Sequence, residues 1–216
     1  MEINKYIDHT VLKATATEKD IIELCREAKE YNFFSVCVNS GYVSLAAKQL
    51  EGSMIKVCTV VGFPLGAMST EAKVFETRQA LKDGAEEVDM VINIGELKSK
   101  NFKKVEEEIA AIKKEVGDKV LKVIIETCYL TPQEIMLASE IAVKAKADFV
   151  KTSTGFGGDG ARMENIELMK KAVEGKAKIK ASGGVKNLDT ALSFIEAGVE
   201  RIGTSSGVSI VKELKK

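Results

Sequence analysis

The chain has 216 residues, enough for one sizeable hydrophobic core, and its 45% hydrophobic and 30% charged residues are typical of a globular protein. Lys plus Arg and Asp plus Glu balance at 32 each, so the net charge gives no reason to expect a nucleic acid or a membrane surface as a partner. No apolar run approaches the ~20 residues of a membrane span, and the opening residues MEINKYIDHT lack the pattern of a signal peptide, so a cytoplasmic protein is expected.

Short apolar segments rich in β-branched residues predict eight strands. In chain order they cover residues 5–10, 33–39, 55–63, 86–95, 120–127, 148–153, 178–184 and 201–207. Most of these segments lack a clean alternation of polar and apolar residues, which is typical of strands buried on both faces of a parallel sheet.

Helical patterns with recognisable start and stop residues lie between these strands. Thr17 is placed to cap a helix over 18–31, and Thr131, followed by Pro132 and Glu134, is a second strong helix start. The apolar face of the first helix comprises Ile21, Ile22, Leu24, Cys25 and Ala28. The other boundary signals are Ser69 at a helix start and Gly84, Gly117 and Gly198 at helix ends.

Eight consecutive strand–helix units in 216 residues predict a closed TIM (β/α)8 barrel, an α/β fold in which residues 1–216 form a single domain. The alternative is an open doubly wound sheet. It is disfavoured because no GxGxxG motif opens the first crossover and no pair of edge strands stands out.

In a barrel the active-site groups lie at the carboxyl ends of the strands. Alternation along the fourth strand places Asp89 on the face opposite Val88 and Met90, which is the barrel interior. Lys151 and Lys180 end the sixth and seventh strands, so an aspartate and two lysines are expected to converge. Three interpretations are open: a reactive centre, an ordinary network of ion pairs, or lysines whose ammonium groups extend to solvent.

A second cation beside Lys151 has a chemical use. Desolvation and a neighbouring ammonium group both favour an uncharged amine, and an uncharged amine attacks a carbonyl carbon to form a Schiff base.

Small residues follow the last strands of the predicted barrel. The turns SGG at 182–184 and GTSSG at 203–207 follow strands seven and eight, where barrels often bind phosphate. The segment TGFGGDGA at 154–161 follows strand six and is either a third wall of the site, a lid or a flexible loop. A phosphate-bearing substrate is therefore expected.

No metal and no cofactor are expected. The four cysteines contain no CxxC pair, and a single histidine, His9, cannot complete a zinc site with thiols so scattered along the chain. Reduced, mostly buried thiols are the simplest interpretation. His9 is expected to be a core histidine with its hydrogen bonds satisfied, and Cys37 a packing residue.

Several motifs together closely resemble the deoxyribose-phosphate aldolases, from about residue 3 to residue 210. They are IDHTVLKATAT, VCVN, VVGFPLGAMSTEAKVFET, GAEEVDMVINIG, LKVIIET, FVKTSTGFG, IKASGGV and RIGTSSG. The resemblance implies a class I aldolase on a (β/α)8 barrel that needs no cofactor. It implies reversible cleavage of 2-deoxy-D-ribose 5-phosphate to D-glyceraldehyde 3-phosphate and acetaldehyde, a role in deoxyribonucleotide catabolism, and a homodimer or homotetramer.

The resemblance also implies roles for particular residues. Lys151 is the Schiff-base nucleophile, Lys180 perturbs it and exchanges protons, and Asp89 relays protons through water. The residues beside the sugar hydroxyls are Asp8, Thr10 and Thr154. The residues at phosphate-binding positions are Gly155, Gly183, Gly184, Gly203, Ser205 and Ser206.

The sequence departs from the resemblance at two places. Phe156 stands where some members have a lysine that helps to hold phosphate, and the tail VKELKK lacks a longer, tyrosine-ended extension. The first departure predicts weaker phosphate affinity, and the second leaves open which groups assist proton transfer. The alternatives are a Schiff-base barrel for a different sugar phosphate and a non-catalytic phosphate-binding barrel.

Overall fold

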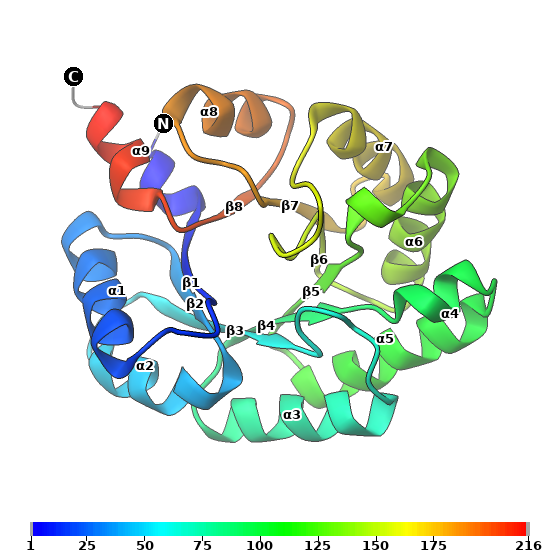
Figure 1. The fold of residues 1–216 in the computed structure, drawn as a ribbon, viewed down its shortest axis with the longest axis horizontal. Coiled ribbons are helices and arrows are strands. Elements are labelled where there is room, and N and C mark those ends of the chain that lie inside the picture. The colour runs from blue at the N-terminus through cyan, green and yellow to red at the C-terminus, as the bar shows by residue number, and fades with distance from the viewer. Residues whose placement is uncertain (1, 215–216) are drawn as a thin grey trace.

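The computed structural model describes residues 2–214, and in it eight parallel strands close into a barrel (Figure 1). The strands are β1 (Ile7–Val11), β2 (Ser35–Val38), β3 (Lys56–Val61), β4 (Glu87–Val91), β5 (Val120–Ile124), β6 (Phe149–Lys151), β7 (Lys178–Ser182) and β8 (Arg201–Thr204). Each strand pairs with the next along the chain, and β8 pairs with β1. The predicted (β/α)8 barrel is confirmed, and the open doubly wound sheet is excluded.

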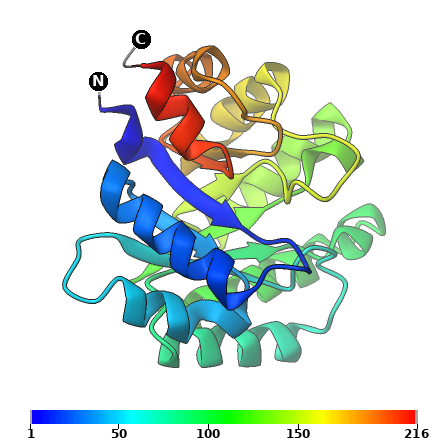
Figure 2. The same ribbon diagram turned by 60° about the vertical axis from the view of Figure 1, so that its left-hand side comes forward.

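A ring of helices surrounds the barrel (Figures 1 and 2). The helices are α1 (Glu18–Tyr31), α2 (Val43–Gln49), α3 (Thr70–Lys82), α4 (Ile94–Lys98), α5 (Phe102–Val116), α6 (Pro132–Lys144), α7 (Met163–Val173), α8 (Leu188–Glu196) and α9 (Gly207–Glu213), with 3-10 turns at Ile3–Tyr6, Ser40–Tyr42 and Thr127–Tyr129. The first 3-10 turn packs beside α9, so the two ends of the described chain meet. The last two residues of the VKELKK tail lie outside the described part.

Most predicted helix boundaries are confirmed. The side chains of Thr17 and Thr131 accept hydrogen bonds from the third helical residue, and the acidic side chains of Asp20 and Glu134 bond back, forming two capping boxes. Ser69 caps α3, and Gly84, Gly117 and Gly198 stand at or just beyond the ends of α3, α5 and α8. Ile22 was predicted wrongly: it lies at the edge of the apolar face of α1 and is 43% exposed.

The apolar core has two parts. Side chains such as Val88, Met90 and Ile92 pack between the sheet and the helices in one large cluster, as the alternation of β4 predicted. Inside the barrel, a small second cluster comprises Leu12, Cys37, Cys58 and Val60. Since the outer layer supplies most of the buried apolar surface, the interior has room for polar groups.

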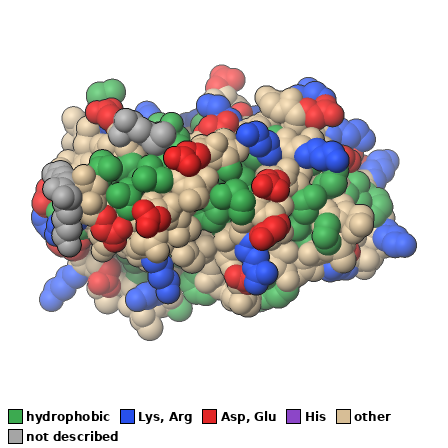
Figure 3. Space-filling model, turned by 90° about the horizontal axis from the view of Figure 1, so that it is seen from above, with side chains coloured by type: hydrophobic (Ala, Val, Ile, Leu, Met, Phe, Trp, Pro, Cys, Tyr) green, Lys and Arg blue, Asp and Glu red, His purple; other side chains and the backbone are tan. Residues whose placement is uncertain are grey.

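The surface agrees with the balanced charge of the chain. On the face shown in Figure 3, lysine and arginine side chains are interspersed with aspartate and glutamate. Among residues 2–214, no helix combines the length and the apolar character needed to cross a membrane.

Candidate active site

A buried carboxylate on β4, Asp89, is the centre of the barrel interior. Its Oδ2 accepts hydrogen bonds from the Nζ atoms of Lys151 at 2.7 Å and Lys180 at 2.8 Å, and its Oδ1 accepts one from Lys122 at 2.9 Å. These lysines come from β6, β7 and β5. The expected convergence of Asp89 with Lys151 and Lys180 is confirmed, and the structure adds Lys122 of the fifth strand to the groups that contact Asp89.

The two predicted lysines lie very close together. Because both Nζ atoms contact the same oxygen, at 2.7 and 2.8 Å, they are at most about 5.5 Å apart. Lys151 and Lys180 are also direct partners in the register of β6 and β7. Lys151 is only 3% exposed, so it lies in a site from which most water is excluded.

A second layer of charges lies against Asp89 and the lysines. Arg201 on β8 donates from Nε to Asp8 at 2.7 Å and from Nη2 to Glu87 at 2.6 Å. Glu87 also accepts from Lys122 at 2.6 Å, and Lys180 donates to Asp8. Sequence reasoning missed Arg201 and Glu87, although alternation along β4 places Glu87 on the same face as Asp89.

This network sets the charge of its members. Burial acts to raise the pKa of Asp89, but the ammonium groups of Lys122 and Lys151 outweigh it and hold the pKa well below its usual range. Burial acts to lower the pKa of Lys180, but the carboxylates of Asp8 and Asp89 outweigh it and raise the pKa above its usual value. Asp89 is therefore ionised and Lys180 protonated at neutral pH.

The three residues predicted beside the sugar hydroxyls occupy different environments. Asp8 is fully buried and bonded to Lys180, Arg201 and Ser35, so its position is that of an ion-pair partner. Thr10, half-buried, donates to the carbonyl of Asp8 at 2.8 Å. The buried hydroxyl of Thr154 donates to Glu126, a neighbour that sequence reasoning did not connect with it.

The predicted phosphate-binding turns come together at the carboxyl ends of β6, β7 and β8. Gly183 and Gly184 have φ of +84° and +78°, a conformation that side chains disfavour. The amide of Ala161 donates to the carbonyl of Gly183 at 3.0 Å, so the 154–161 loop packs on this turn (Figure 1). Gly203 approaches Ser182 so closely that a Cβ atom would lie 2.3 Å from the serine Oγ.

The other phosphate candidates differ in exposure. Gly155, Gly184 and Ser205 are exposed, and Ser206 is half-buried with its amide donating to Thr204 at 2.9 Å. Phe156 is 52% exposed, and its ring meets Phe63 edge-on, with the centroids 5.3 Å apart. This contact joins the loops after β6 and β3, which lie on different sides of the barrel mouth.

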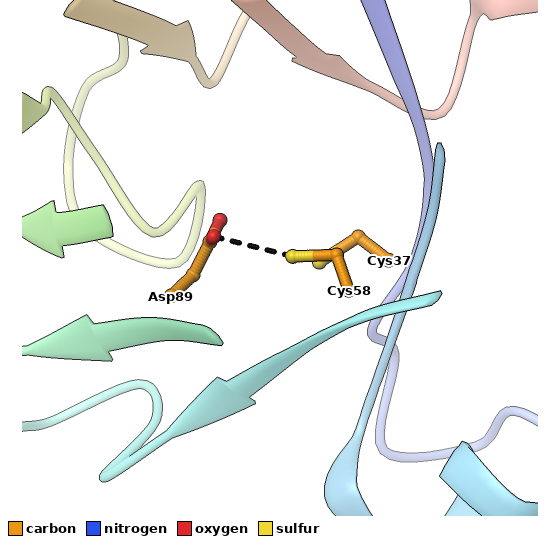
Figure 4. Close-up of side chains that lie close together, drawn as sticks. All are labelled: Cys37, Cys58 and Asp89. Carbon is orange, nitrogen blue, oxygen red and sulfur yellow. Dashed lines mark hydrogen bonds between the residues drawn. The ribbon is translucent and has the colours of Figure 1, made fainter. Parts of the chain in front are cut away.

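His9 packs against a helix, whereas two of the thiols lie inside the barrel. His9 is buried, as expected, and its Nε2 lies 2.7 Å from Glu27 on α1, but its buried Nδ1 has no hydrogen-bond partner among the described residues. Cys37 and Cys58 lie inside the barrel, and the thiol of Cys58 donates to Asp89 at 3.2 Å (Figure 4). Sequence spacing did not predict this contact.

Fold and site together are those of a (β/α)8 barrel enzyme, with buried charged groups inside the barrel and Lys151 at the carboxyl end of β6. Comparison with known proteins narrows this class. The chain belongs to the DeoC/LacD family of aldolases, whose family model matches residues 3–213. It is therefore a carbon–carbon lyase, and the family resemblance seen in the sequence is confirmed.

Named relatives agree with this assignment. The chain is 59% identical over 212 residues to a deoxyribose-phosphate aldolase of Finegoldia magna, covering 98% of this chain and 100% of the relative. A deoxyribose-phosphate aldolase of Clostridium tetani is 54% identical over the full length of both chains. A crystal structure of a putative deoxyribose-phosphate aldolase from Coccidioides immitis has a TM-score of 0.98 and 43% identity, covering 100% of this chain and 86% of the other.

Proposed function

We propose that this chain, as one barrel domain spanning residues 1–216, cleaves 2-deoxy-D-ribose 5-phosphate reversibly to D-glyceraldehyde 3-phosphate and acetaldehyde, through a Schiff base on Lys151. One observation carries the proposal. Lys151 is an almost fully buried amine at the carboxyl end of β6, in contact with an ionised carboxylate and close to a second lysine whose charge is fixed. Among these surroundings, burial and the neighbouring charged lysine are the two that favour an uncharged, nucleophilic amine.

The reaction begins with the uncharged amine of Lys151. It attacks C1 of the open-chain sugar, and loss of water leaves an iminium ion. The iminium draws electrons from the C2–C3 bond while Asp89, acting through water, accepts the proton of the C3 hydroxyl. Glyceraldehyde 3-phosphate leaves, the enamine is protonated at C2, and hydrolysis releases acetaldehyde and restores the amine.

Lys180 and Asp89 exchange protons along this path. Lys180 donates a hydrogen bond to Asp89. Its ammonium group can donate a proton to the enamine or to the departing water. The protonated form of Lys180 also opposes a second positive charge on Lys151.

The substrate is oriented with its phosphate on the turns after β6, β7 and β8. These turns offer backbone amides and hydroxyls at Gly155, Gly183, Gly184, Gly203 and the serines Ser205 and Ser206. The exposed Phe156 supplies no charge there, so phosphate is held by neutral donors on this side. We place the sugar hydroxyls beside Thr10 and Thr154.

The proposed setting is the cytoplasmic catabolism of deoxyribose phosphates. A deoxyribose phosphate aldolase from Aeropyrum pernix has a tetrameric structure. It is 32% identical to this chain with a TM-score of 0.92, and the match covers 99% of this chain and 91% of the other. We extend this to a homodimer or homotetramer of the present chain.

Borohydride reduction in the presence of acetaldehyde tests the proposal. We expect one added ethyl group per chain, mapped by peptide mass spectrometry to Lys151, and neither trapping nor cleavage in Lys151→Arg, because an arginine cannot form the Schiff base. Lys178→Arg, an exposed lysine of β7, is the matched control and should be trapped normally. Trapping that persists in Lys151→Arg places the nucleophile elsewhere, and Lys180 is then the first residue to map.

Two further assays separate the alternatives. Cleavage of deoxyribose 5-phosphate compared with fructose phosphates distinguishes this reaction from that of another Schiff-base barrel. A barrel that only binds phosphate would show no trapping at all.

A further inference from the structure

Two thiols and a carboxylate meet inside the barrel, beside the lysines. Cys37 on β2 and Cys58 on β3 are direct partners in the strand register, and Asp89 stands on the next strand (Figure 4). One ligand atom from each residue lies within 4.8 Å of the other two, and all three side chains are buried. We infer that Cys37, Cys58 and Asp89 bind a thiophilic divalent cation, such as Zn²⁺ or Cd²⁺, and that binding inhibits the enzyme.

The geometry is close to that of a tetrahedral ion. Zinc lies about 2.3 Å from thiolate sulfur and about 2.0–2.2 Å from carboxylate oxygen, which separates neighbouring ligand atoms by about 3.5–3.8 Å. Cys58 Sγ and Asp89 Oδ1 are already 3.2 Å apart, so small rotations of the side chains complete the triangle. Thiolate ligands select soft cations over Mg²⁺ or Ca²⁺, and water can take the fourth position.

A neighbouring set of groups is less suitable. Asp8, Cys58 and Glu87 also offer three ligand atoms within 4.8 Å. Both of those carboxylates are bonded to Arg201, whose guanidinium group keeps its charge at any pH of interest. A cation there would have to displace a permanent charge. The cations on Asp89 are instead lysines, and two of the three, Lys122 and Lys180, have a second carboxylate partner.

Binding leaves the charge of the interior unchanged. Coordination by two thiolates releases two thiol protons, so the site gains two positive charges and loses two. Lys122, 3.4 Å from the sulfur of Cys58, remains bonded to Glu87 at 2.6 Å and can withdraw toward it. The ion therefore enters a site that already contains ammonium groups without adding net charge.

The thiols lie on a wall that reaches the mouth of the barrel. Cys37 and Cys58 cluster with Leu12, which follows β1, and with the half-buried Phe63, which follows β3. Both neighbours lie beyond the carboxyl ends of their strands, so an ion that enters from the mouth meets this wall.

Inhibition follows from the position of Asp89. A carboxylate oxygen bound to a cation no longer accepts a proton readily, and the cation draws the carboxylate away from Lys151 and Lys180. This part of the inference rests on the role proposed above for Asp89, whereas cation binding itself does not depend on it.

Cadmium titration of the full-length chain tests both parts. The protein is reduced with a phosphine and freed of chelators, and Cd²⁺ alone is added while the thiolate-to-cadmium charge-transfer absorption is followed. We expect one Cd²⁺ per chain, and binding weaker by about 10–100-fold or more in Cys37→Ala and in Cys58→Ala, since losing even an outer-shell partner has that effect. The control is Cys25→Ala, a buried thiol of α1 away from the barrel interior, which should keep both absorption and affinity.

Aldolase activity is measured in the same titration. Cd²⁺ should inhibit the wild type and Cys25→Ala reversibly, with recovery on adding a chelator. In Cys58→Ala, the Cd²⁺ concentration for half-inhibition should rise by the same factor as the dissociation constant measured from the absorption. Cadmium NMR of the wild-type chain, whose chemical shift reports the number of sulfur ligands, checks the ligand set should a variant fail to fold.

An unchanged charge-transfer band in the Cys37→Ala/Cys58→Ala double variant would overturn the site. Full activity with Cd²⁺ bound would overturn the inhibitory role. A wild-type chain that binds Cd²⁺ but has no aldolase activity would count against the proposed function and leave the cation site standing.

Discussion

Replacing Lys180 with methionine tests why two lysines share one carboxylate oxygen. Burial acts to lower the pKa of Lys180, but Asp8 and Asp89 raise it above its usual value, so this ammonium group stays charged at neutral pH. It lies at most about 5.5 Å from the amine of Lys151, since each is within 2.8 Å of Asp89 Oδ2. A fixed positive charge at that distance opposes protonation of Lys151.

The size of the effect follows from the distance. With an effective dielectric constant of about 20, two unit charges about 5.5 Å apart repel by about 3 kcal/mol. At roughly 1.4 kcal/mol per pH unit, this corresponds to about two units. Methionine keeps much of the stem volume but removes the charge, and it leaves Asp89 to act more strongly on Lys151. The pH midpoint of borohydride trapping with acetaldehyde should therefore rise by about two units.

Trapping is a better measurement than turnover, because in the reaction proposed above Lys180 also exchanges protons, so its loss would lower activity for that separate reason. The trapped fraction is read by mass spectrometry across a pH series, with circular dichroism to check folding. Lys178→Met removes an exposed lysine from the same strand and should leave the midpoint in place. A folded Lys180→Met chain with the wild-type midpoint would refute the reasoning and assign Lys180 another role.

Three further predictions concern the carboxylate and the phosphate turns. Asp89→Asn should lower the cleavage rate by roughly 10²–10⁴ while trapping continues more slowly; near wild-type cleavage would make Asp89 a structural ion-pair residue. Ser206→Ala and Gly184→Asp should raise KM for deoxyribose 5-phosphate more than for unphosphorylated deoxyribose, in steady-state kinetics on both sugars, and equal losses would place the phosphate elsewhere. Burial acts to raise the pKa of Asp89, but Lys122 and Lys151 outweigh it and depress the pKa. The ionised carboxylate therefore stabilises the folded chain above about pH 4, and this contribution is lost as the pH falls. In urea titrations, the free energy of unfolding should therefore fall less steeply below about pH 4 in Asp89→Asn than in the wild type.

Much of the fold and the central part of the site could be predicted from the sequence, because local rules determine them. Hydrophobic segments and capping residues such as Thr17 and Thr131 mark the element boundaries directly. The two-residue period of a strand is enough to place Asp89 inside the barrel. Lys151 followed from the rule that active-site groups lie at the carboxyl ends of barrel strands. Lys180 was expected at the end of strand seven, but it stands in the middle of β7, two residues before the strand ends.

The missed residues depend on how the strands are arranged around the barrel. Glu87 and Arg201 stand at the beginnings of strands, and a charged residue there is ordinarily taken as exposed. Only closure of the sheet brings Arg201 of β8 against Glu87 of β4 and buries both. The contact between Cys37 and Cys58 likewise comes from the register of β2 with β3, which spacing along the chain does not encode.

The composition of the interior network distinguishes Lys151 from the other cations of the barrel. Among the described residues, this bonded network contains Lys122, Lys151, Lys180 and Arg201 against Asp8, Glu87 and Asp89. One cation is therefore in excess, and loss of a single proton balances the charges in a place where an uncompensated charge is costly. Arg201 cannot lose its proton. Burial acts to lower the pKa of Lys122 and of Lys180, but neighbouring carboxylates outweigh it and raise the pKa of both lysines. Lys151 differs from these three cations in having a single carboxylate partner, Asp89. The charges that hold the barrel together thus also single out the amine that we propose attacks the sugar.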